Sequence, residues 1–452
     1  MSSLTQAALS CAGAVLSGIH TQADVDPFSA MVPAEHLGHC GEAIAQLAEA
    51  LALAVATTPT GGCDALRQKR CDDLLRVARA KLHAHPFAAV PANWRRLFTD
   101  ASLVKAAIMV LRGGGEGGDD ALAVLDMAII MAGAPGPGAD DAVRAKREAL
   151  EALLEALDEH GTLCEEEEEE KKEEEEEEGL AFDRTVDAVE VRCPIDRRPE
   201  LSLDGFQRHM DGANTPLIVT GALGHWPAMS TNPWKSSSYL LSLTHGGRRL
   251  VPVEVGRAYT DPGWGQKIVP FREFLETYMA PGSEEIGYLA QHTLFSQIPK
   301  LRNDFLIPDY CYSTPRDPPE NVKAAGPLEE PLINAWLGPR GTVSPLHTDP
   351  YANVLAQVVG SKYLRLYPPD ETARVFPRGV EAGGVDMANT SRVEVEEEGG
   401  GKELTEEESR VFGRARYVDC VLKEGELLFI PAGWWHYVRS LEASFSVSFW
   451  WN

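Results

Sequence analysis

The segment GTVSPLHTDPYANVLAQVVGSKYLRLYPP, residues 341–369, decides the fold of the C-terminal part of this chain. Its two apolar, β-branched runs, 353–360 and 362–367, are bounded by glycine and proline, as short strands are. His347 and Asp349 stand two positions apart, and side chains at positions i and i+2 of a strand point to the same face. The pattern therefore predicts a strand-rich region in which one histidine and one carboxylate share a face.

The same composition continues on both sides of this segment. From residue 181 onward, short β-rich stretches are punctuated by glycine and proline; the others lie at 216–221, 250–256, 333–338, 420–430 and 444–451. The last, SFSVSFWW, alternates small polar with large apolar residues, which predicts a half-buried strand. Many short antiparallel strands predict a jelly-roll or cupin barrel, that is, a double-stranded β-helix.

A metal held by one histidine and one carboxylate needs a third ligand from another strand. His436 in LLFIPAGWWHYVRSL, residues 427–441, is the candidate because it lies in a second β-rich segment. Two histidines and one carboxylate on one face leave three positions of an octahedral iron open, as in non-haem Fe(II) oxygenases. A keto acid can take two of these positions and dioxygen the third. The sequence therefore predicts that His347, Asp349 and His436 bind a catalytic iron.

A second His-x-Asp pair shows how weak this motif is by itself. His209 and Asp211 lie in LSLDGFQRHMDG, residues 201–212, which predicts a helix that ends in a turn. There the two side chains would not share a face, so His209 is expected at the surface. The context favours His347, because a strand, Lys362 and a distal histidine follow it.

The N-terminal part of the chain, 1–160, differs from the rest. It is rich in alanine and leucine and shows helical periodicity, as at Leu150, Leu153, Leu154 and Leu157. We therefore expect an α+β protein with an all-helical N-terminal domain, 1–160, an acidic linker, 161–180, and a β-barrel domain, 181–452.

The formal net charge of −26 is concentrated in two glutamate runs. Glu165–Glu178 has twelve Glu and two Lys, a charge of −10, and Glu394–Glu408 has eight Glu and one Lys, a charge of −7. Such runs repel themselves and stay solvated, which predicts a linker and a loop. Alternatively, they attract basic partners such as histone tails or ribosomal proteins. Direct nucleic-acid binding is not expected, because phosphate contacts need clustered Lys and Arg.

The eight cysteines are scattered and include no CxxC pair, which argues against a zinc ribbon and a disulfide framework. No apolar run reaches membrane-spanning length. The mildly apolar stretch Ala7–Ile19 has no Lys or Arg before it, so a secretory signal is not expected. We therefore expect a soluble protein of a reducing, intracellular compartment.

Six stretches of the chain resemble the JmjC family of 2-oxoglutarate oxygenases. They are PLIVTGALGHWPA (216–228), VPVEVGRAYTDPGW (251–264), YLAQHTLFSQIPKL (288–301), INAWLGPRGTVSPLHTDPYAN (333–353), GSKYLRLYPP (360–369) and ELLFIPAGWWHYVRSLEASFSVSFWW (426–451). Within the family they are similar to the branch described both as lysine-specific demethylase eight and as arginyl hydroxylase. The helical part, 1–160, resembles this branch only in being helical. An acidic, glycine-rich insertion near 390–410 departs from the family pattern and is expected to be a loop away from the metal.

The resemblance implies roles for residues around the predicted iron site, with Fe(II), 2-oxoglutarate and dioxygen as cofactor and co-substrates. His347, Asp349 and His436 match the iron ligands. Lys362 matches the residue that pairs with the far carboxylate of 2-oxoglutarate, and a carboxylate deep in a barrel does need a buried cation. The positions that match other co-substrate contacts are Tyr288, Ser344 and Asn353 as hydrogen-bonding residues and Trp450 as a wall.

The positions that match substrate contacts in arginyl-hydroxylating relatives are Glu254, Trp264 and Trp336. A carboxylate between indole faces suits a guanidinium, and it suits a methylated ammonium as well. Each assignment has a purely structural alternative. Tyr288 and Trp450 could be ordinary core, and Glu254 an exposed strand residue. The remaining alternatives are a turn residue at Ser344, a loop cap at Asn353 and a solvated strand lysine at Lys362.

The resemblance therefore implies hydroxylation of arginine in a basic protein, such as a histone, ribosomal or chromatin-associated protein, in the nucleus or cytoplasm. Histone methyl-lysine demethylation is the first alternative. A catalytically silent chromatin-binding or regulatory module is the second, and a cupin isomerase or dioxygenase without a keto acid is the third. The complete triad argues against the second, and Lys362 argues against the third.

Overall fold

The computed structural model describes most of the chain. The described residues are 3–20, 61–85, 89–113, 118–133, 144–157, 182–261, 263–320, 322, 325–381 and 386–452. The chain divides into two compact units, one of residues 1–175 with His245–Val251 and one of residues 176–244 with Pro252–Asn452. The acidic linker predicted at 161–180 lies outside the described residues, and the predicted three-part division of the chain stays a proposal.

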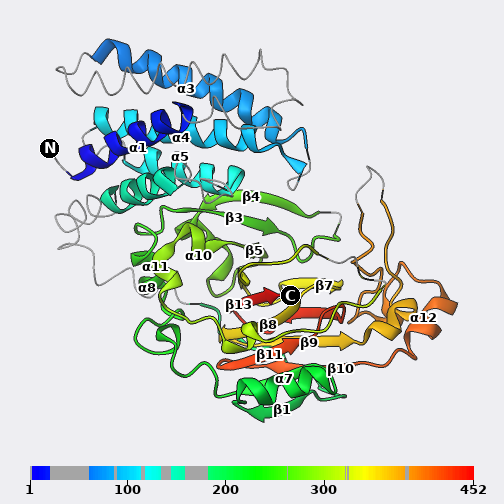
Figure 1. Cartoon of the computed structure of the whole chain (residues 1–452). Coiled ribbons are helices and arrows are strands. Elements are labelled where there is room, and N and C mark those ends of the chain that lie inside the picture. Colours follow the sequence, from blue (N-terminus) through cyan, green and yellow to red (C-terminus); the bar gives the residue numbers. More distant parts are fainter. Residues whose placement is uncertain are drawn as a thin grey trace. The chain divides into compact units, whose positions relative to one another are not determined.

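The first unit is helical, as its composition predicted. Its helices are α1 (Ser3–His20), α3 (Gly61–Leu82), α4 (Ala92–Gly113), α5 (Gly118–Ala132) and a further helix at 144–157 (Figure 1). The periodic leucines of the last helix, at 150, 153, 154 and 157, are all buried, which confirms the predicted core-facing stripe. None of the described helices is long and apolar enough to cross a membrane.

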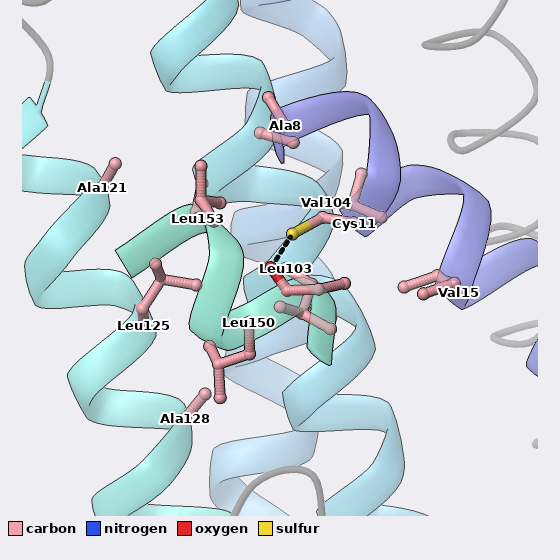
Figure 2. Packing of buried hydrophobic residues seen from close by; sticks show 14 of the residues in the cluster. Ala8, Cys11, Val15, Leu103, Val104, Ala121, Leu125, Ala128, Leu150 and Leu153 are labelled. Atoms are coloured by element: carbon pink, nitrogen blue, oxygen red, sulfur yellow. Dashed lines mark hydrogen bonds between the residues drawn. The ribbon is translucent and has the colours of Figure 1, made fainter. Parts of the chain in front are cut away.

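Small and branched side chains fill the core between these helices (Figure 2). Cys11 of α1, Leu103 of α4 and Leu125 of α5 are all fully buried there. The Cys11 thiol donates a hydrogen bond to the Ala149 carbonyl, 3.2 Å away. Burial raises the pKa of this thiol to about 12, so it stays protonated and acts as an apolar core residue.

Two buried ion pairs lie within the same unit. Lys146 Nζ is 2.6 Å from Asp100 Oδ1. Arg249, from the segment His245–Val251, donates through Nε and Nη2 to Asp126 of α5 at 2.7–3.0 Å. Charges are tolerated in a core only when they are paired and hydrogen-bonded. The pair with Asp126 therefore fixes a segment from the middle of the chain to the helical unit.

The second unit is built on two β-sheets, as the strand-rich sequence predicted. Its strands are β1 (Asp196–Pro199), β2 (Leu217–Thr220), β3 (Leu250–Val255), β4 (Gly265–Pro270), β5 (Gly287–His292), β6 (Leu332–Gly338), β7 (Val343–His347), β8 (Ala352–Val359), β9 (Lys362–Tyr367), β10 (Val418–Leu422), β11 (Glu426–Ile430), β12 (Trp435–Ser440) and β13 (Ser444–Trp451). One sheet has the order β1-β2-β11-β8-β13-β6-β5-β3-β4, and the other has the order β10-β9-β12-β7 (Figure 1). The central pairs β11–β8, β13–β6 and β12–β7 are antiparallel, which agrees with the predicted double-stranded β-helix.

Short helices connect the strands. They are α7 (Leu203–Asp211), η4 (Pro227–Met229), α8 (Ser237–Ser242), α9 (Phe271–Phe274), η5 (Leu275–Met279), α10 (Leu294–Gln297), α11 (Pro299–Arg302), η6 (Asp309–Tyr312), η7 (Pro369–Arg374), η8 (Glu398–Gly400) and α12 (Glu406–Phe412). The β-rich segment predicted at 420–430 contains two strands, β10 and β11, separated by a turn in which Gly425 has a φ of 87°.

The prediction of a half-buried strand at 444–451 is wrong, because both faces of β13 are buried. On one face Phe445 stacks on Trp234, with ring centroids 4.4 Å apart. On the other face the serines turn into the barrel, where Ser446 donates to Gln357 Oε1 at 2.8 Å. The barrel interior supplies polar partners for this face, so the polar half of the alternation does not indicate solvent.

The expected surface position of His209 is also wrong. The predicted helix exists as α7, but His209 is only 8% exposed. Its Nε2 lies 2.8 Å from the Thr215 carbonyl, and its ring packs edge-on against Phe429. A core hydrogen bond satisfies this histidine, and its partner in the motif, Asp211, stays exposed.

The acidic insertion near 390–410 is more ordered and closer to the metal-binding strand than expected. Its second half forms α12, which begins with a capping box between Thr405 and Glu408. In its first half, Ser391 N donates to the Leu346 carbonyl at 2.8 Å, so the backbone pairs with β7. The insertion is therefore not a plain loop remote from His347.

A buried carboxylate organises the segment behind β13. Asp304 is 1% exposed and accepts three hydrogen bonds, from Asn232 Nδ2 at 2.7 Å, Trp234 Nε1 at 2.9 Å and Tyr239 Oη at 2.7 Å. Removing it would leave these donors without an acceptor, and each unsatisfied buried group is costly.

We expect Asp304→Ala to lower the free energy of unfolding by about 3 kcal/mol or more, as measured by urea denaturation followed by tryptophan fluorescence. Asp317→Ala, at an exposed aspartate, is the control and should change the unfolding free energy by less than about 0.5 kcal/mol. Equal effects of the two substitutions would show that Asp304 does not organise this segment.

Candidate metal centre

The two histidines of the predicted triad face each other across a pair of strands. His347 is the last residue of β7, and His436 is the second residue of β12. The strands pair antiparallel with His436 directly opposite His347, and the ring centroids are 4.1 Å apart. Directly opposed side chains of an antiparallel pair project from the same face. The pairing register therefore brings the two imidazoles together.

Asp349 reaches the histidines from a turn. It lies between the end of β7 and the start of β8, so the strand rule that predicted its direction does not apply. Its carbonyl accepts a hydrogen bond from Gly433 N at 2.9 Å. Gly433 has a φ of 80°, and a Cβ there would come within 2.6 Å of Pro319, so this position needs glycine. The bond ties the turn to the loop that leads into His436.

Backbone carbonyls fix the tautomer of both imidazoles. His347 Nδ1 is 2.7 Å from the Pro345 carbonyl, and His436 Nδ1 is 3.0 Å from the Trp434 carbonyl. A carbonyl can only accept, so each Nδ1 carries the hydrogen and each Nε2 keeps its lone pair. These Nε2 atoms lie 3.8 Å and 3.5 Å, respectively, from Asp349 Oδ2.

The surroundings keep these groups in their metal-binding forms. Burial, and secondarily the neighbouring His436, lowers the pKa of His347 to about 4, so the ring is neutral at physiological pH. Burial alone would raise the pKa of Asp349, but its interactions with His436 and His347 outweigh burial and hold the pKa below its ordinary value. A neutral imidazole and an ionised carboxylate are the forms that coordinate a metal.

The three side chains fit an iron ion. Their ligand atoms lie within 4.8 Å of one another, and no other such cluster occurs among the residues that the structure describes. Asp349 Oδ2 is buried, and within the described part of the chain it has no hydrogen-bond partner. A buried, ionised oxygen beside two imidazole lone pairs is stabilised by a bound cation. The donor set is that of a non-haem Fe(II) centre.

Lys362, the predicted carboxylate partner, is a buried cation. It is 1% exposed, and its Nζ donates to Tyr288 Oη at 3.1 Å. In the described structure no carboxylate lies within ion-pair distance of Nζ, and burial lowers the pKa of Lys362 to about 7. Because an unpaired buried charge is costly, this position fits a ligand that brings its own carboxylate.

One cavity brings together the triad and all the residues predicted to bind the co-substrate. It is lined by Tyr288, Trp336, Ser344, His347, Asp349, Asn353, Leu355, Lys362, Ile430, His436, Val438, Ser448 and Trp450. Asn353 Oδ1 and Trp450 Nε1 are buried there without a hydrogen-bond partner among the described residues. Buried polar groups of this kind need partners. Together with Lys362, these two groups fit a small keto acid such as 2-oxoglutarate, and we propose that they bind it.

Of the three predicted substrate residues, one lines the cavity and the other two are hydrogen-bonded to each other. Trp336 lines the cavity and donates from Nε1 to Ser448 Oγ at 2.9 Å. Glu254 pairs directly with Tyr288 across β3 and β5, so its side chain projects from the same face of the sheet. Trp264 Nε1 donates to Glu254 Oε2 at 3.3 Å. Burial raises the pKa of Glu254, and this hydrogen bond partly opposes the rise.

Two residues near the centre were not predicted. Burial, and secondarily the charges of Asp349 and Glu254, raises the pKa of Tyr259, whose hydroxyl oxygen lies 3.4 Å from Thr390 Oγ1. Tyr259 lies in an irregular segment after β3, where no sequence periodicity indicates the direction of its side chain. Ser448 could have been found, because the alternation of β13 puts it on the same face as Trp450.

Comparison with known proteins gives a family match. A family described as the cupin-like domain matches residues 204–452, which is more than half of the chain. The matched region includes all the strands of the barrel except β1, and it contains every residue of the candidate centre.

Three curated relatives illustrate the similarity. Lysine-specific demethylase 8 of Danio rerio is 44% identical over 270 residues, which cover 59% of each chain. Lysine-specific demethylase JMJ30 of Arabidopsis thaliana is 36% identical over 399 residues, 83% of this chain and 84% of the relative. The bifunctional peptidase and (3S)-lysyl hydroxylase JMJD7 of Homo sapiens is 22% identical, over 55% of this chain and 80% of the relative.

The similarity to the Arabidopsis protein extends into the helical region. A match that covers 83% of the chain cannot be contained in residues 161–452, which are about two thirds of it. The expectation that the helical part, 1–160, resembles its relatives only in being helical is therefore wrong.

The metal assignment can be tested with the two His-x-Asp motifs of this chain. We expect Asp349→Ala to weaken Mn(II) binding at least about 100-fold in isothermal titration calorimetry, because loss of even an outer partner of a metal ligand costs about 10–100-fold. Asp211→Ala removes the matching aspartate of the second motif and should leave the affinity unchanged. Equal Mn(II) affinities of the two variants would rule out the assignment.

Because burial lowers the pKa of Lys362 to about 7, we expect the affinity for 2-oxoglutarate to depend on pH. Below pH 7 the free protein already carries the charge that pairs with the carboxylate; above pH 7 a proton must be taken up on binding. The dissociation constant should therefore rise with pH, by up to about tenfold per unit. Calorimetry on the Mn(II)-loaded protein between about pH 6.5 and 8.5 measures this slope. Lys362→Met should abolish this pH dependence of the dissociation constant. Lys300→Met, at an exposed lysine, is the control and should keep it. A wild-type dissociation constant that does not change with pH would contradict the proposed role of Lys362.

Proposed function

Because this chain belongs to the cupin-like JmjC family of 2-oxoglutarate oxygenases, we propose that it is an Fe(II)-dependent oxygenase that hydroxylates an arginine side chain of a basic protein. The observation that carries the proposal is a single cavity with the His347–Asp349–His436 cluster and the buried cation of Lys362 in its walls. A cluster without this lysine would suit other cupin chemistry equally well.

The residues of the cavity divide the work between metal and co-substrate. His347, Asp349 and His436 would hold Fe(II) and leave one face open. Lys362 would pair with the far carboxylate of 2-oxoglutarate and so orient its keto-acid end towards the metal. Bound Fe(II) and 2-oxoglutarate together reduce dioxygen, placing one oxygen atom in a substrate C–H bond and the other in succinate, with release of carbon dioxide.

Apolar walls protect this site from water. Leu355, Ile430 and Val438 line the cavity beside the polar groups, and each is largely or partly buried. Excluding water strengthens the pairing between Lys362 and a carboxylate, because the local dielectric is low. The chain's own contribution is therefore orientation and a dry environment.

The choice of arginine rests on the group around Glu254. Its carboxylate projects from the same sheet face as Tyr288, which lines the metal cavity, and Trp264 holds it by a hydrogen bond. A carboxylate beside an indole can pair with a guanidinium and stack on its plane. We infer that Glu254 and Trp264 receive the cationic head of the substrate and that Trp336 lines the path to the metal.

The second candidate is methyl-lysine demethylation of a histone, which is favoured by the similarity to the lysine-specific demethylases of Danio rerio and Arabidopsis thaliana. A methylated ammonium is a cation and could use the same walls. Hydroxylation of an N-methyl group gives a product that loses formaldehyde, so the same site could perform either reaction. Either substrate places the protein in the nucleus or cytoplasm, and we propose those compartments.

Mass spectrometry of arginine-containing and methyl-lysine-containing basic peptides after incubation with Fe(II), 2-oxoglutarate and dioxygen separates the candidates. We expect an oxygen atom to be gained on arginine, with one succinate formed per event. Loss of a methylene unit from methyl-lysine would establish the demethylase instead. No oxidation of any peptide, with no succinate formed, would favour a silent binding module.

A matched pair of substitutions tests the substrate residue in the same assay. Glu254→Gln keeps the size of the side chain but removes its charge, so the KM for the arginine peptide should rise about tenfold or more. The KM for 2-oxoglutarate should stay unchanged. Glu273→Gln, at an exposed glutamate, should alter neither constant.

A further inference from the structure

Two segments next to the start of the acidic insertion form an antiparallel pair beside the metal centre. We call residues 376–380 and 386–392 the paired arm. Its rungs are the bridges Pro377–Ser391 and Val380–Asp386 and the hydrogen bond from Arg378 N to the Thr390 carbonyl at 2.7 Å.

The paired arm extends the smaller sheet past its edge strand. Thr390 forms an antiparallel bridge with His347, the last residue of β7. Thr348 N donates to the Asn389 carbonyl at 2.9 Å, which joins the arm to the residue between the two metal-binding side chains. Thr390 itself is 2% exposed. The position of the arm is therefore fixed relative to the metal centre by backbone hydrogen bonds.

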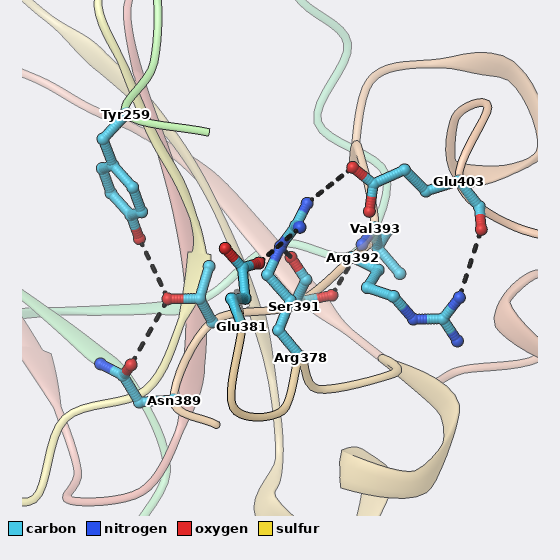
Figure 3. A network of polar contacts seen from close by, with 9 residues as sticks. Tyr259, Arg378, Glu381, Asn389, Ser391, Arg392, Val393 and Glu403 are labelled. Carbon is cyan, nitrogen blue, oxygen red and sulfur yellow. Dashed lines mark hydrogen bonds and ion pairs between the residues drawn. The ribbon is translucent and has the colours of Figure 1, made fainter. Parts of the chain in front are cut away.

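Ion pairs hold the arm in place (Figure 3). Arg378 contacts Glu381 at 3.1 Å and Glu403 at 2.9 Å. Arg392 contacts Glu408 at 2.6 Å. The contacts with Glu403 and Glu408 join the arm to α12 and to the segment that leads into it. Because several charges form one network, the arm is held more firmly than by isolated surface pairs.

A directed chain of hydrogen bonds ends at Asn389 (Figure 3). The Thr390 hydroxyl donates to Asn389 Oδ1 at 3.4 Å, and its oxygen lies 3.4 Å from Tyr259 Oη. A hydroxyl has one hydrogen, so Thr390 accepts from Tyr259 while it donates to Asn389. Asn389 is exposed, and within the described structure its amide nitrogen donates no hydrogen bond. The chain orients the amide and leaves its N–H groups available.

Tyr259 links this chain to the strand that carries Glu254. It follows the end of β3, and its hydroxyl oxygen lies 3.4 Å from Thr390 Oγ1. Asn389 is thus connected through Thr390 to the segment that follows the proposed cation site. The arm also supplies the residue that pairs with His347. Both connections put the Asn389 side chain at the rim of the proposed active site.

We propose that Asn389, oriented by Thr390 and Tyr259, binds the main chain of the polypeptide substrate next to the residue that is oxidised. An asparagine amide has two donors and an acceptor, so it can bond both the carbonyl and the N–H of one residue in an extended chain. This contact selects a residue within a polypeptide over the free amino acid. This inference rests on the proposed function, and it identifies Asn389 as the residue that distinguishes a polypeptide substrate from free arginine.

The test compares the steady-state kinetics of Asn389→Ala and Val380→Ala on an arginine-containing basic peptide. Val380 is an exposed residue of the same arm, 71% accessible, and serves as the control. Loss of one or two hydrogen bonds should raise the KM for the peptide about fivefold to tenfold in Asn389→Ala. The kcat, the KM for 2-oxoglutarate and the activity on free arginine should stay at wild-type values.

Thr390→Val is a second variant for the same test, because it keeps the shape of the side chain but breaks the chain of hydrogen bonds. It should shift the peptide KM in the same direction as Asn389→Ala. An unchanged peptide KM in both variants, while the wild type oxidises the peptide, would overturn this proposal and leave the proposed function standing. A wild-type protein that neither oxidises nor binds any basic peptide would overturn both.

Discussion

The register of two strands decides whether this chain has a metal centre. β7 and β12 pair so that His347 stands opposite His436, and the bond from Gly433 to the carbonyl of Asp349 brings the carboxylate to the same point. A shift of β12 by one residue would turn His436 to the other face of the sheet, away from His347. Each Nδ1 bonds to the carbonyl two residues earlier in its own segment, so the local backbone sets the tautomer while the register sets the position of the rings.

The second constraint is the cost of polar groups inside the barrel. Among the described residues no carboxylate pairs with the Lys362 ammonium, and three other polar atoms of the cavity lack hydrogen-bond partners: Asp349 Oδ2, Asn353 Oδ1 and Trp450 Nε1. The aromatic layer behind β13 and the hydrogen bonds to Asp304 stabilise the opposite face of this strand. A co-substrate with a carboxylate would pair with the buried ammonium group of Lys362. Local destabilisation in the free protein thus becomes binding energy for the ligand.

The sequence indicated the barrel and the His347–Asp349 pair, because strand periodicity and the His-x-Asp spacing are local patterns. His436 is distant in the sequence and was found by its own β-rich context, and the role of Lys362 came from the family resemblance. Other features depend on packing that no local pattern reveals. The burial of the serine face of β13 depends on Gln357, from another strand. The burial of His209 depends on Phe429, which is distant in the sequence. The glutamates of the insertion indicated solvent, yet the insertion's backbone completes an edge of β7, and backbone hydrogen bonds leave no trace in composition.

The central claim is that one cavity holds both Fe(II) and the keto acid, with Lys362 at the far carboxylate. A crystal structure of the protein with Mn(II) and 2-oxoglutarate, grown without dioxygen, tests it most directly. We expect the metal on His347, Asp349 and His436, the keto acid chelating it, and the distal carboxylate within hydrogen-bond distance of Lys362 Nζ. A metal bound elsewhere, or a keto acid whose distal carboxylate points away from Lys362, would contradict the account.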